Sequence, residues 1–311
     1  MEQTVLYSEI FKSIQGEGHY TGVPTVWLRM FGCNLECNGF GQDDPTNPES
    51  YILPYKDFDL IDVKNVEDLP VWKYGCDSSY SWSKKFSKIQ KRGNPDEVAK
   101  KLYDLMNDHR THIAFTGGEP MMKAAQKNIV KIYHEMKKLF EAENEWGYYG
   151  KKYNNHITNV TFETNGTRPI EPVMNDLIRN TSLGQDRTEW FFSVSPKLWH
   201  TAGEKDRICP DIVKGYQDAC GHFDGYQGNI EPKGQLKFVC NGSDDSWNEI
   251  EESIVKFRDA GVMYPIWIMP VGATEESQDE VAKEITIETM NRGYNVSARV
   301  HCYIFGNQIG T

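Results

Sequence analysis

Six short apolar segments that alternate with helical signals constrain the fold of this chain more than any other feature. We expect strands at residues 25–30, 112–115, 159–162, 190–194, 235–239 and 265–268. Helices are expected at residues 94–107, 124–141, 171–179, 245–259 and 276–292, and a last extended segment at residues 297–304. Strands that alternate with helices are typical of a parallel sheet. The sequence therefore predicts an α/β protein.

The helix expected at residues 94–107 has the clearest start. Asn94 is a capping residue, Pro95 stands at the first helical position, and Asp96 and Glu97 fill the first turn. Proline lacks the amide hydrogen that would be unpaired at that position, and acidic side chains favour the positive end of the helix dipole.

Polar motifs directly follow four of the expected strands. They are Thr116-Gly117-Gly118-Glu119-Pro120, Glu163-Thr164-Asn165-Gly166, Ser195-Pro196-Lys197 and Met269-Pro270-Val271-Gly272. The carboxyl ends of the strands are where α/β barrels place their chemistry. Carboxylates, hydroxyls and close glycine backbones suit an amino-acid head group or a ribose. The sequence therefore predicts one shared site at this end of the sheet.

Three cysteines lie near the start of the chain with unequal spacing. Cys33 and Cys37 form a Cys-x3-Cys pair, and Cys76 follows after 38 further residues, 38–75. In a reducing compartment, cysteines are metal ligands or buried thiols more often than disulfides. Three thiolates suit an iron–sulfur cluster with one open iron. Zinc bound by three cysteines and a histidine is the alternative; the histidine candidates are His19, His112 and His301.

Two further features suggest contact with an anionic or polar ligand. Glu17 is flanked by Gly16 and Gly18, so the backbone of this loop can approach a ligand closely. Arg29 stands late in an apolar strand and needs an anionic partner, either within the protein or on a substrate.

Residues 38–75 differ in composition from the rest of the chain, because they are acidic, contain prolines and show no clear periodicity of apolar residues. A loop of this length inside a compact domain is usually functional or irregular. We expect an insertion that packs locally through Tyr51, Ile52, Tyr55, Phe58 and Trp72. Residues 79–93 are polar and basic and are expected to form a solvated face.

The overall charge and hydrophobicity exclude some classes of protein. The formal charge of −11 disfavours a broad nucleic-acid-binding surface, which needs a basic face. No apolar run approaches the roughly 20 residues that cross a bilayer, and the first residues lack a signal-peptide pattern. We therefore expect a cytoplasmic protein with a small-molecule substrate, no nucleic-acid partner and no membrane association.

In this order, the motifs resemble those of the radical SAM (S-adenosylmethionine) superfamily, and more narrowly the 7-carboxy-7-deazaguanine synthase (QueE) family. The resemblance rests on residues 11–18, 21–24, 27–29, 32–37, 76–82, 116–120, 163–166 and 195–197, with weaker matches at 269–272 and 299–301. It implies an incomplete (β/α)6 TIM-like barrel, formed by a single domain over residues 1–311. Residues 38–75 would be a loop inserted after the second cluster cysteine.

The resemblance also implies a reaction. SAM would be cleaved reductively at a [4Fe–4S] cluster, and the resulting 5′-deoxyadenosyl radical would take a hydrogen atom from 6-carboxy-5,6,7,8-tetrahydropterin. Ring contraction with loss of ammonia would give 7-carboxy-7-deazaguanine, with Mg²⁺ assisting. A flavodoxin or ferredoxin would supply the electron, and a homodimer is expected.

The resemblance assigns roles to residues by position. Cys33, Cys37 and Cys76 would ligate the cluster, and Ser78 would bind Mg²⁺. The residues implied for SAM are Gly118, Glu119, Glu163, Asn165, Ser195, Pro196, Lys197, Met269, Pro270, Val271 and Gly272. Those implied for the pterin are Ile14, Gln15, Gly16, Glu17, Arg29 and Thr116. Arg29 would bind the substrate carboxylate through both arms of its guanidinium.

The chain departs from the family pattern at two places. The family commonly has Cys-x3-Cys-x2-Cys, whereas here the second gap is the 38 residues before Cys76. The two residues after Cys76, Asp77 and Ser78, nevertheless match those that follow the third cysteine in the family pattern. At the C-terminus, His301 is followed by Cys302, and the role of the remaining residues to Thr311 is left open.

Two alternatives remain at this stage. One is another radical SAM enzyme, such as an activase that generates a glycyl radical on a partner protein. The other is a zinc-bound or cluster-free protein that binds a partner through residues 38–75.

Overall fold

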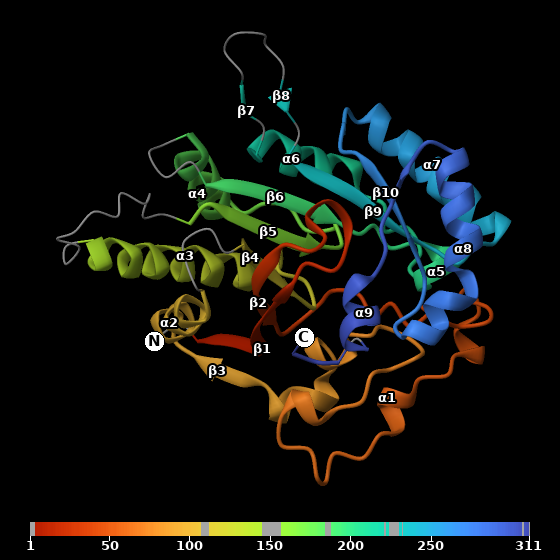
Figure 1. Cartoon of the computed structure of the whole chain (residues 1–311), viewed down its shortest axis with the longest axis horizontal. Helices are drawn as coiled ribbons and strands as arrows, with labels where there is room; N and C mark the ends of the chain where they lie inside the picture. Colours follow the sequence, from red (N-terminus) through yellow and green to blue (C-terminus); the bar gives the residue numbers. More distant parts are fainter. Residues whose placement is uncertain are drawn as a thin grey trace.

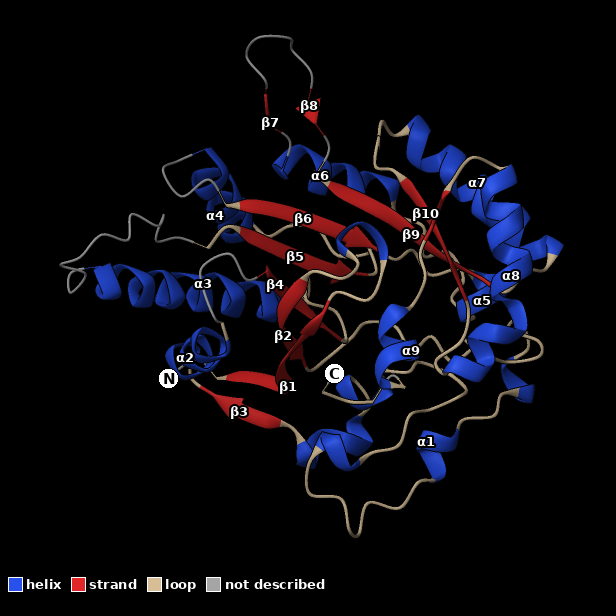
Figure 2. Ribbon diagram, viewed as in Figure 1, coloured by secondary structure: helices blue, strands red, loops and turns tan. Residues whose placement is uncertain are grey.

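The computed structural model describes residues 4–106, 112–144, 157–183, 188–220, 222–223, 230–231, 233–306 and 308–310. A nine-stranded mixed sheet forms its centre, in the order β11-β10-β9-β6-β5-β4-β2-β1-β3. The sheet is twisted, and the long helices lie along its outer side (Figures 1 and 2). Strands β7 (His222–Phe223) and β8 (Ile230–Glu231) form a separate antiparallel pair.

Six neighbouring strands in the sheet run parallel to one another. They are β2 (Pro24–Met30), β4 (His112–Gly117), β5 (Asn159–Thr164), β6 (Glu189–Val194), β9 (Gly234–Cys240) and β10 (Ile266–Pro270). The six strands expected from the sequence are thus confirmed, with small shifts of their ends. Short β11 (Asn295–Val296) extends the parallel set.

The other edge of the sheet is antiparallel and was not predicted. Strand β1 (Val5–Ile14) pairs with β2 and with the short β3 (Lys91–Gly93). The sheet is therefore mixed rather than purely parallel.

Helices connect most of the parallel strands, as expected. The longer ones are α2 (Pro95–Leu105), α3 (Lys123–Asn144), α4 (Pro172–Leu183), α6 (Pro210–Cys220), α7 (Asp244–Asp259) and α8 (Glu275–Asn291). The start of α2 is confirmed, because Asn94 and Glu97 form a reciprocal capping box. The expected end of α2, Asn107, lies outside the described residues. No described helix is long and apolar enough to cross a membrane.

The expected extended segment at residues 297–304 is wrong. The chain there forms helix α9 (Val300–Phe305), which ends at Gly306 in the left-handed conformation. The run of bulky apolar residues suggested a strand. However, Cys302 is buried while Tyr303, Ile304 and Phe305 are exposed, so burial does not alternate as it would in a half-buried strand.

The hydrophobic core lies between the outer face of the sheet and the helices. Phe162 of β5 stacks against Phe115, Phe192 and Trp190, with ring centroids 5.0–5.8 Å away. Successive side chains on a strand point to opposite faces. The neighbours of these aromatic residues therefore point to the inner face, which is where Thr116 and Glu163 lie beside the pocket described below.

Residues 38–75 form loops around the short helix α1 (Pro54–Asp57) and the 3-10 helices η2 (Pro48–Ser50) and η3 (Val66–Asp68). Their apolar residues share a second core with the two 3-10 helices that follow, η4 (Ser79–Ser81) and η5 (Lys84–Ile89). Tyr55, Phe58 and Trp72 pack there as expected. Ile52 does not, because it is 54% exposed.

The aromatic core generates a stability prediction. Phe162→Ala should lower the free energy of unfolding by about 3–5 kcal/mol, because it leaves a cavity among three aromatic rings. Val255→Ala on the outer surface of α7, where Val255 is 57% exposed, should change it by no more than about 0.5 kcal/mol. Urea unfolding measures both, and a loss below about 1 kcal/mol for Phe162→Ala contradicts this packing.

Candidate active site

The three cysteines converge on one pocket although they are distant in sequence. Cys33, Cys37 and Cys76 all line a cavity of about 280 Å³ and belong to one apolar cluster with Leu35 and Phe40. A backbone hydrogen bond closes the intervening loop, since Gly75 N–H donates to the Phe40 carbonyl at 2.8 Å. The segment of residues 38–75 thus begins and ends beside Cys37.

The backbone around the cysteines is shaped for close approach. Cys37 has a φ of 51°, a conformation that non-glycine residues rarely adopt. At Gly118, a Cβ atom would lie 2.2 Å from the Gly32 carbonyl oxygen and 2.9 Å from the Cys33 Cβ. Only glycine therefore fits at this point between the strand end and the cysteine loop.

The thiols are held in an apolar setting. Burial raises the pKa of Cys33 to about 12 and that of Cys76 to about 11, and it raises the pKa of Cys37 well above its usual value. The nearby Lys197 lowers each of these pKa values in part. Three converging thiols beside one cation are a donor set that fits a cluster held by thiolates.

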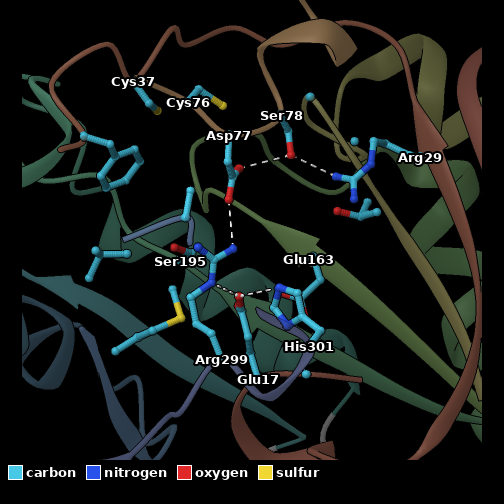
Figure 3. Close-up of a pocket in the computed structure, with 18 of the residues that line it drawn as sticks. Glu17, Arg29, Cys37, Cys76, Asp77, Ser78, Glu163, Ser195, Arg299 and His301 are labelled. Carbon is cyan, nitrogen blue, oxygen red and sulfur yellow. Dashed lines mark hydrogen bonds and ion pairs between the residues drawn. The ribbon is translucent and has the colours of Figure 1, made fainter. Parts of the chain in front are cut away.

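The zinc alternative finds no support in the positions of the histidines. His112 is buried and its ring lies 2.6 Å from the Thr161 hydroxyl, while His19 stacks on Phe191. His301 Nε2 lies 3.9 Å from Glu17 and 3.7 Å from the Cys302 thiol, and its ring lies across the pocket from Cys37 and Cys76 (Figure 3). Among the described residues, no three His, Cys, Asp or Glu side chains are placed to hold a single metal ion.

Opposite the cysteines, a chain of ion pairs crosses the floor of the pocket (Figure 3). Lys237 of β9, whose side chain is 3% exposed, lies 2.5 Å from Glu17 and 3.1 Å from Glu163. Arg299 pairs with Glu17 at 2.9 Å and with Asp77 at 2.8 Å. Burial by itself raises the pKa of Glu17, but Lys237 and Arg299 hold it well below the usual range.

Arg29 of β2 also lines the pocket. Its Nε atom lies 2.6 Å from Glu9, which is the anionic partner expected for an arginine in this strand. Its Nη1 donates to the Ser78 hydroxyl at 3.0 Å, and Ser78 donates to Asp77 at 3.2 Å. Arg29 thus holds Ser78, which lies two residues after the third cysteine.

The pocket brings together nearly all of the residues singled out from the sequence. Those that line it are Ile14, Gln15, Gly16, Glu17, Arg29, Cys33, Cys37, Cys76, Ser78, Thr116, Gly118, Glu163, Asn165, Ser195, Lys197, Met269, Pro270, Val271 and Gly272. Glu119 and Pro196 do not line it. The Glu119 carboxylate instead accepts hydrogen bonds from Met121 N–H, the Thr164 hydroxyl and Asn165 N–H, so it supports the wall from behind.

Charged residues of this pocket to which sequence analysis gave no role include Asp77, Lys237 and Arg299. Asp77 was noticed only as a neighbour of Cys76, and His301 only as a candidate zinc ligand and as part of the weak match at residues 299–301. For Lys237 the signal was strand alternation, since it lies between the outward-facing Leu236 and Phe238 of β9. Arg299 lies within the weak match at residues 299–301, but that match assigned it no role, because its partners Glu17, Asp77 and Gly272 come from other parts of the chain.

A family model for a 4Fe-4S single cluster domain matches residues 14–166, the part that contains all three cysteines. The chain is 24% identical to a 7-carboxy-7-deazaguanine synthase of Pyrobaculum aerophilum, over 97% of this chain and 95% of the relative. It is 25% identical to the Rhodopirellula baltica protein of the same name, over 100% of this chain and 90% of the relative.

The crystal structure of QueE from Escherichia coli has a similar fold. It matches with a TM-score of 0.50 at 15% identity, covering 96% of this chain and 95% of that one. Over almost its whole length the chain is similar to proteins that bear the name 7-carboxy-7-deazaguanine synthase. The likeness to the solved structure shows a shared fold.

The position of His112 generates a pH prediction. Burial lowers the pKa of His112 from 6.5 to about 4. Between these values the unfolded chain binds a proton that the folded protein excludes, so stability falls as the pH drops through this window. The loss attributable to His112 should be about 3 kcal/mol.

The His112→Asn variant isolates this contribution. Urea unfolding of the metal-free variant between pH 4 and pH 7 should show a shallower dependence on pH than the parent, because the other groups titrate in both. Parallel curves for the two proteins would mean that His112 is not buried as a neutral side chain.

Proposed function

We propose that this protein is a radical SAM enzyme that converts 6-carboxy-5,6,7,8-tetrahydropterin to 7-carboxy-7-deazaguanine with loss of ammonia. The observation that carries the proposal is the convergence of Cys33, Cys37 and Cys76 with Arg29 and Ser78 in one cavity. Relatives that align with almost the whole chain bear the name of this synthase.

The architecture in this proposal is a single radical SAM domain over residues 1–311. The six parallel strands would form the incomplete (β/α)6 barrel, with the site at their carboxyl ends. Residues 38–75 would be an insertion in the cluster-binding loop. Their separate apolar core supports this, because it lets the segment fold against η4 and η5 without interrupting the strands.

Cys33, Cys37 and Cys76 would hold a [4Fe–4S] cluster and leave one iron for SAM. When bound, the cluster and SAM supply the one-electron chemistry that removes a hydrogen atom from the substrate. The apolar residues Leu35 and Phe40 pack against the thiols and limit access of water to them. The protein's task is to hold the groups in place and to keep the site dry.

The residues proposed for SAM surround the cysteines on the strand ends. They are Gly118, Glu119, Glu163, Asn165, Ser195, Pro196, Lys197 and Met269 to Gly272. Glu119 acts indirectly by fixing Asn165, and Lys197 donates to the Ser195 hydroxyl at 2.8 Å. These contacts orient donors and acceptors before the ligand arrives, which lowers the entropic cost of binding.

The pterin would lie between Arg29, Thr116 and the loop that contains Ile14, Gln15, Gly16 and Glu17. The Gln15 side-chain amide donates to Glu163 at 2.8 Å, and its Oε1 atom accepts from Glu17 N–H at 3.2 Å. Amide and carboxylate groups held in this way can pair with the polar edge of a pterin. Arg29 provides the planar cation for the substrate carboxylate.

Mg²⁺ would bind at the Ser78 hydroxyl, beside the Asp77 carboxylate. Oxygen donors are the ligands that this ion prefers. Glu17, Glu163 and Asp77 carry three formal negative charges against two positive charges on Lys237 and Arg299. The connected group thus has an excess of one negative charge, which favours a cation at this side of the pocket.

An external one-electron donor, such as a flavodoxin or a ferredoxin, completes the proposal. We also infer that the protein works in the cytoplasm as a homodimer. The reaction itself requires only the small-molecule substrate, SAM and the reductant.

An anaerobic assay tests the function. Reconstituted protein, incubated with a chemical reductant, SAM and 6-carboxytetrahydropterin, should yield a product with the mass of 7-carboxy-7-deazaguanine. Formation of 5′-deoxyadenosine without the deazapurine would contradict the proposed substrate and favour an activase. A colourless protein that contains zinc would contradict the radical SAM chemistry altogether.

Arg29→Lys tests the substrate-binding role. A lysine retains the charge but cannot bind a carboxylate through two parallel hydrogen bonds. We expect the KM for the pterin to rise on the order of tenfold or more, since a hydrogen bond between charged groups is lost. Steady-state kinetics with the exposed Arg92→Lys variant as a control measures the effect. An unchanged KM would assign Arg29 to structure alone.

A further inference from the structure

Arg299 lies where three parts of the pocket wall meet. It is the residue before helix α9, and its side chain is 10% exposed. All three guanidinium nitrogens are used: Nε donates to Glu17 at 2.9 Å, Nη1 to the Gly272 carbonyl at 2.6 Å, and Nη2 to Asp77 at 2.8 Å. One side chain therefore links the substrate loop, the end of β10 and the cysteine turn.

The backbone beneath Arg299 is anchored independently of its side chain. Val300 N–H donates to the Gly16 carbonyl at 2.9 Å. A Cβ atom at Gly16 would lie 1.9 Å from His301 Nδ1, so α9 packs directly on this glycine. The guanidinium thus extends from a fixed base towards Asp77.

The turn from Cys76 to Ser78 is followed at once by η4, which is tied to the sheet edge: Gly32 N–H donates to the Ser81 carbonyl at 2.8 Å, and the Tyr80 hydroxyl donates to Glu9 of β1 at 2.8 Å. The turn itself is held mainly through its side chains. Gly75 N–H binds the Phe40 carbonyl, which belongs to the same segment of residues 38–75. Arg29 holds the Ser78 hydroxyl at 3.0 Å. The ion pair formed by Asp77 among the described residues is with Arg299. Two arginines, Arg29 and Arg299, therefore hold the side chains of Ser78 and Asp77 in the turn that presents Cys76.

We propose that Arg299 is a positioning residue that holds the Cys76–Ser78 turn against Cys33 and Cys37 and so couples the C-terminal helix to the third thiolate. The inference rests on the proposed function, because the position of this turn matters for chemistry only if Cys76 is a cluster ligand. A planar guanidinium can reach Glu17, Asp77 and the Gly272 carbonyl together. The compact ammonium of a lysine cannot span these three acceptors.

Thiol alkylation gives a readout that does not depend on catalysis. The metal-free full-length protein is treated with iodoacetamide, and the rates at Cys33, Cys37 and Cys76 are measured by peptide mass mapping. Arg299→Gln removes the ion-pair partner of Asp77, whose negative charge already raises the pKa of the Cys76 thiol. The charge effect alone therefore slows alkylation at Cys76, since the thiolate is the nucleophile.

If Arg299 positions the turn, its loss increases the access of the reagent to Cys76 despite this charge effect. We expect Arg299→Gln to accelerate alkylation of Cys76 on the order of tenfold, as for the loss of a charged hydrogen bond. Cys33 and Cys37 should stay within about twofold of the parent, because the bonds of the Arg299 side chain among the described residues go to Glu17, Gly272 and Asp77 and not to the Cys33–Cys37 loop. Iron per chain after anaerobic reconstitution should fall in the same variant.

Two further variants keep the test decisive. Arg299→Lys, which retains the charge and disturbs folding least, should still accelerate alkylation of Cys76 by at least about threefold. Arg258→Gln is the control for loss of a hydrogen-bonded arginine, because Arg258 binds the backbone carbonyls of Val262 and Tyr264 at a distant site. It should leave all three cysteine rates unchanged.

The proposal is overturned if Cys76 reacts at the parent rate or more slowly in both Arg299 variants. Equal acceleration at all three cysteines would also overturn it, because that pattern indicates general unfolding. A failure of the proposed function is distinguishable, since it appears as a parent protein that makes no deazapurine while the alkylation pattern still reports on Arg299.

Discussion

The return of the chain at Gly75 is the constraint on which the site depends. The hydrogen bond from Gly75 N–H to the Phe40 carbonyl closes a loop of more than thirty residues and places Cys76 beside the Cys33–Cys37 turn. In a flexible chain, closure of a loop of this length costs about 3 kcal/mol in entropy, beyond a constant. Burial of Tyr55, Trp72 and their neighbours in the second core offsets this cost.

Strand alternation explains how an apolar sheet carries a charged pocket. In β5, Phe162 faces the helices while Glu163 faces the pocket. In β9, Phe238 likewise faces the helices and Lys237 faces the pocket. Buried charges are costly unless they are paired. Here Lys237 and Arg299 connect Glu17, Glu163 and Asp77 into one chain of ion pairs, so the polar floor is held without displacing the hydrophobic core.

The sequence predicted the parts of the fold that local signals determine. The six parallel strands and the start of α2 at Asn94 and Pro95 are examples, because apolar segments and capping residues act over a few positions. Helix α9 was mistaken for an extended segment, because its apolar residues face solvent rather than following a helical or alternating pattern. Strand β1 was missed because its residues were interpreted only through the glycine loop that follows.

The sequence predicted those residues of the candidate site that belong to motifs at strand ends or lie next to the cysteines. Lys237 and Arg299 escaped because their importance arises from partners more than two hundred residues away in the sequence. Glu119 was expected at a ligand, yet three protein donors occupy its carboxylate. Single residues inside a motif thus differ in whether they touch the cavity or support those that do, and the sequence does not distinguish them.

The most direct measurement of the central claim is the iron and sulfide content of the anaerobically reconstituted protein and of its Cys76→Ala variant, with Cys209→Ala as the control. The account predicts about four irons per chain and a broad absorbance near 400 nm for the parent and the control. The Cys76→Ala variant should lose that ligation. A variant that retains the full cluster would show that Cys76 is not the third ligand and would contradict the account.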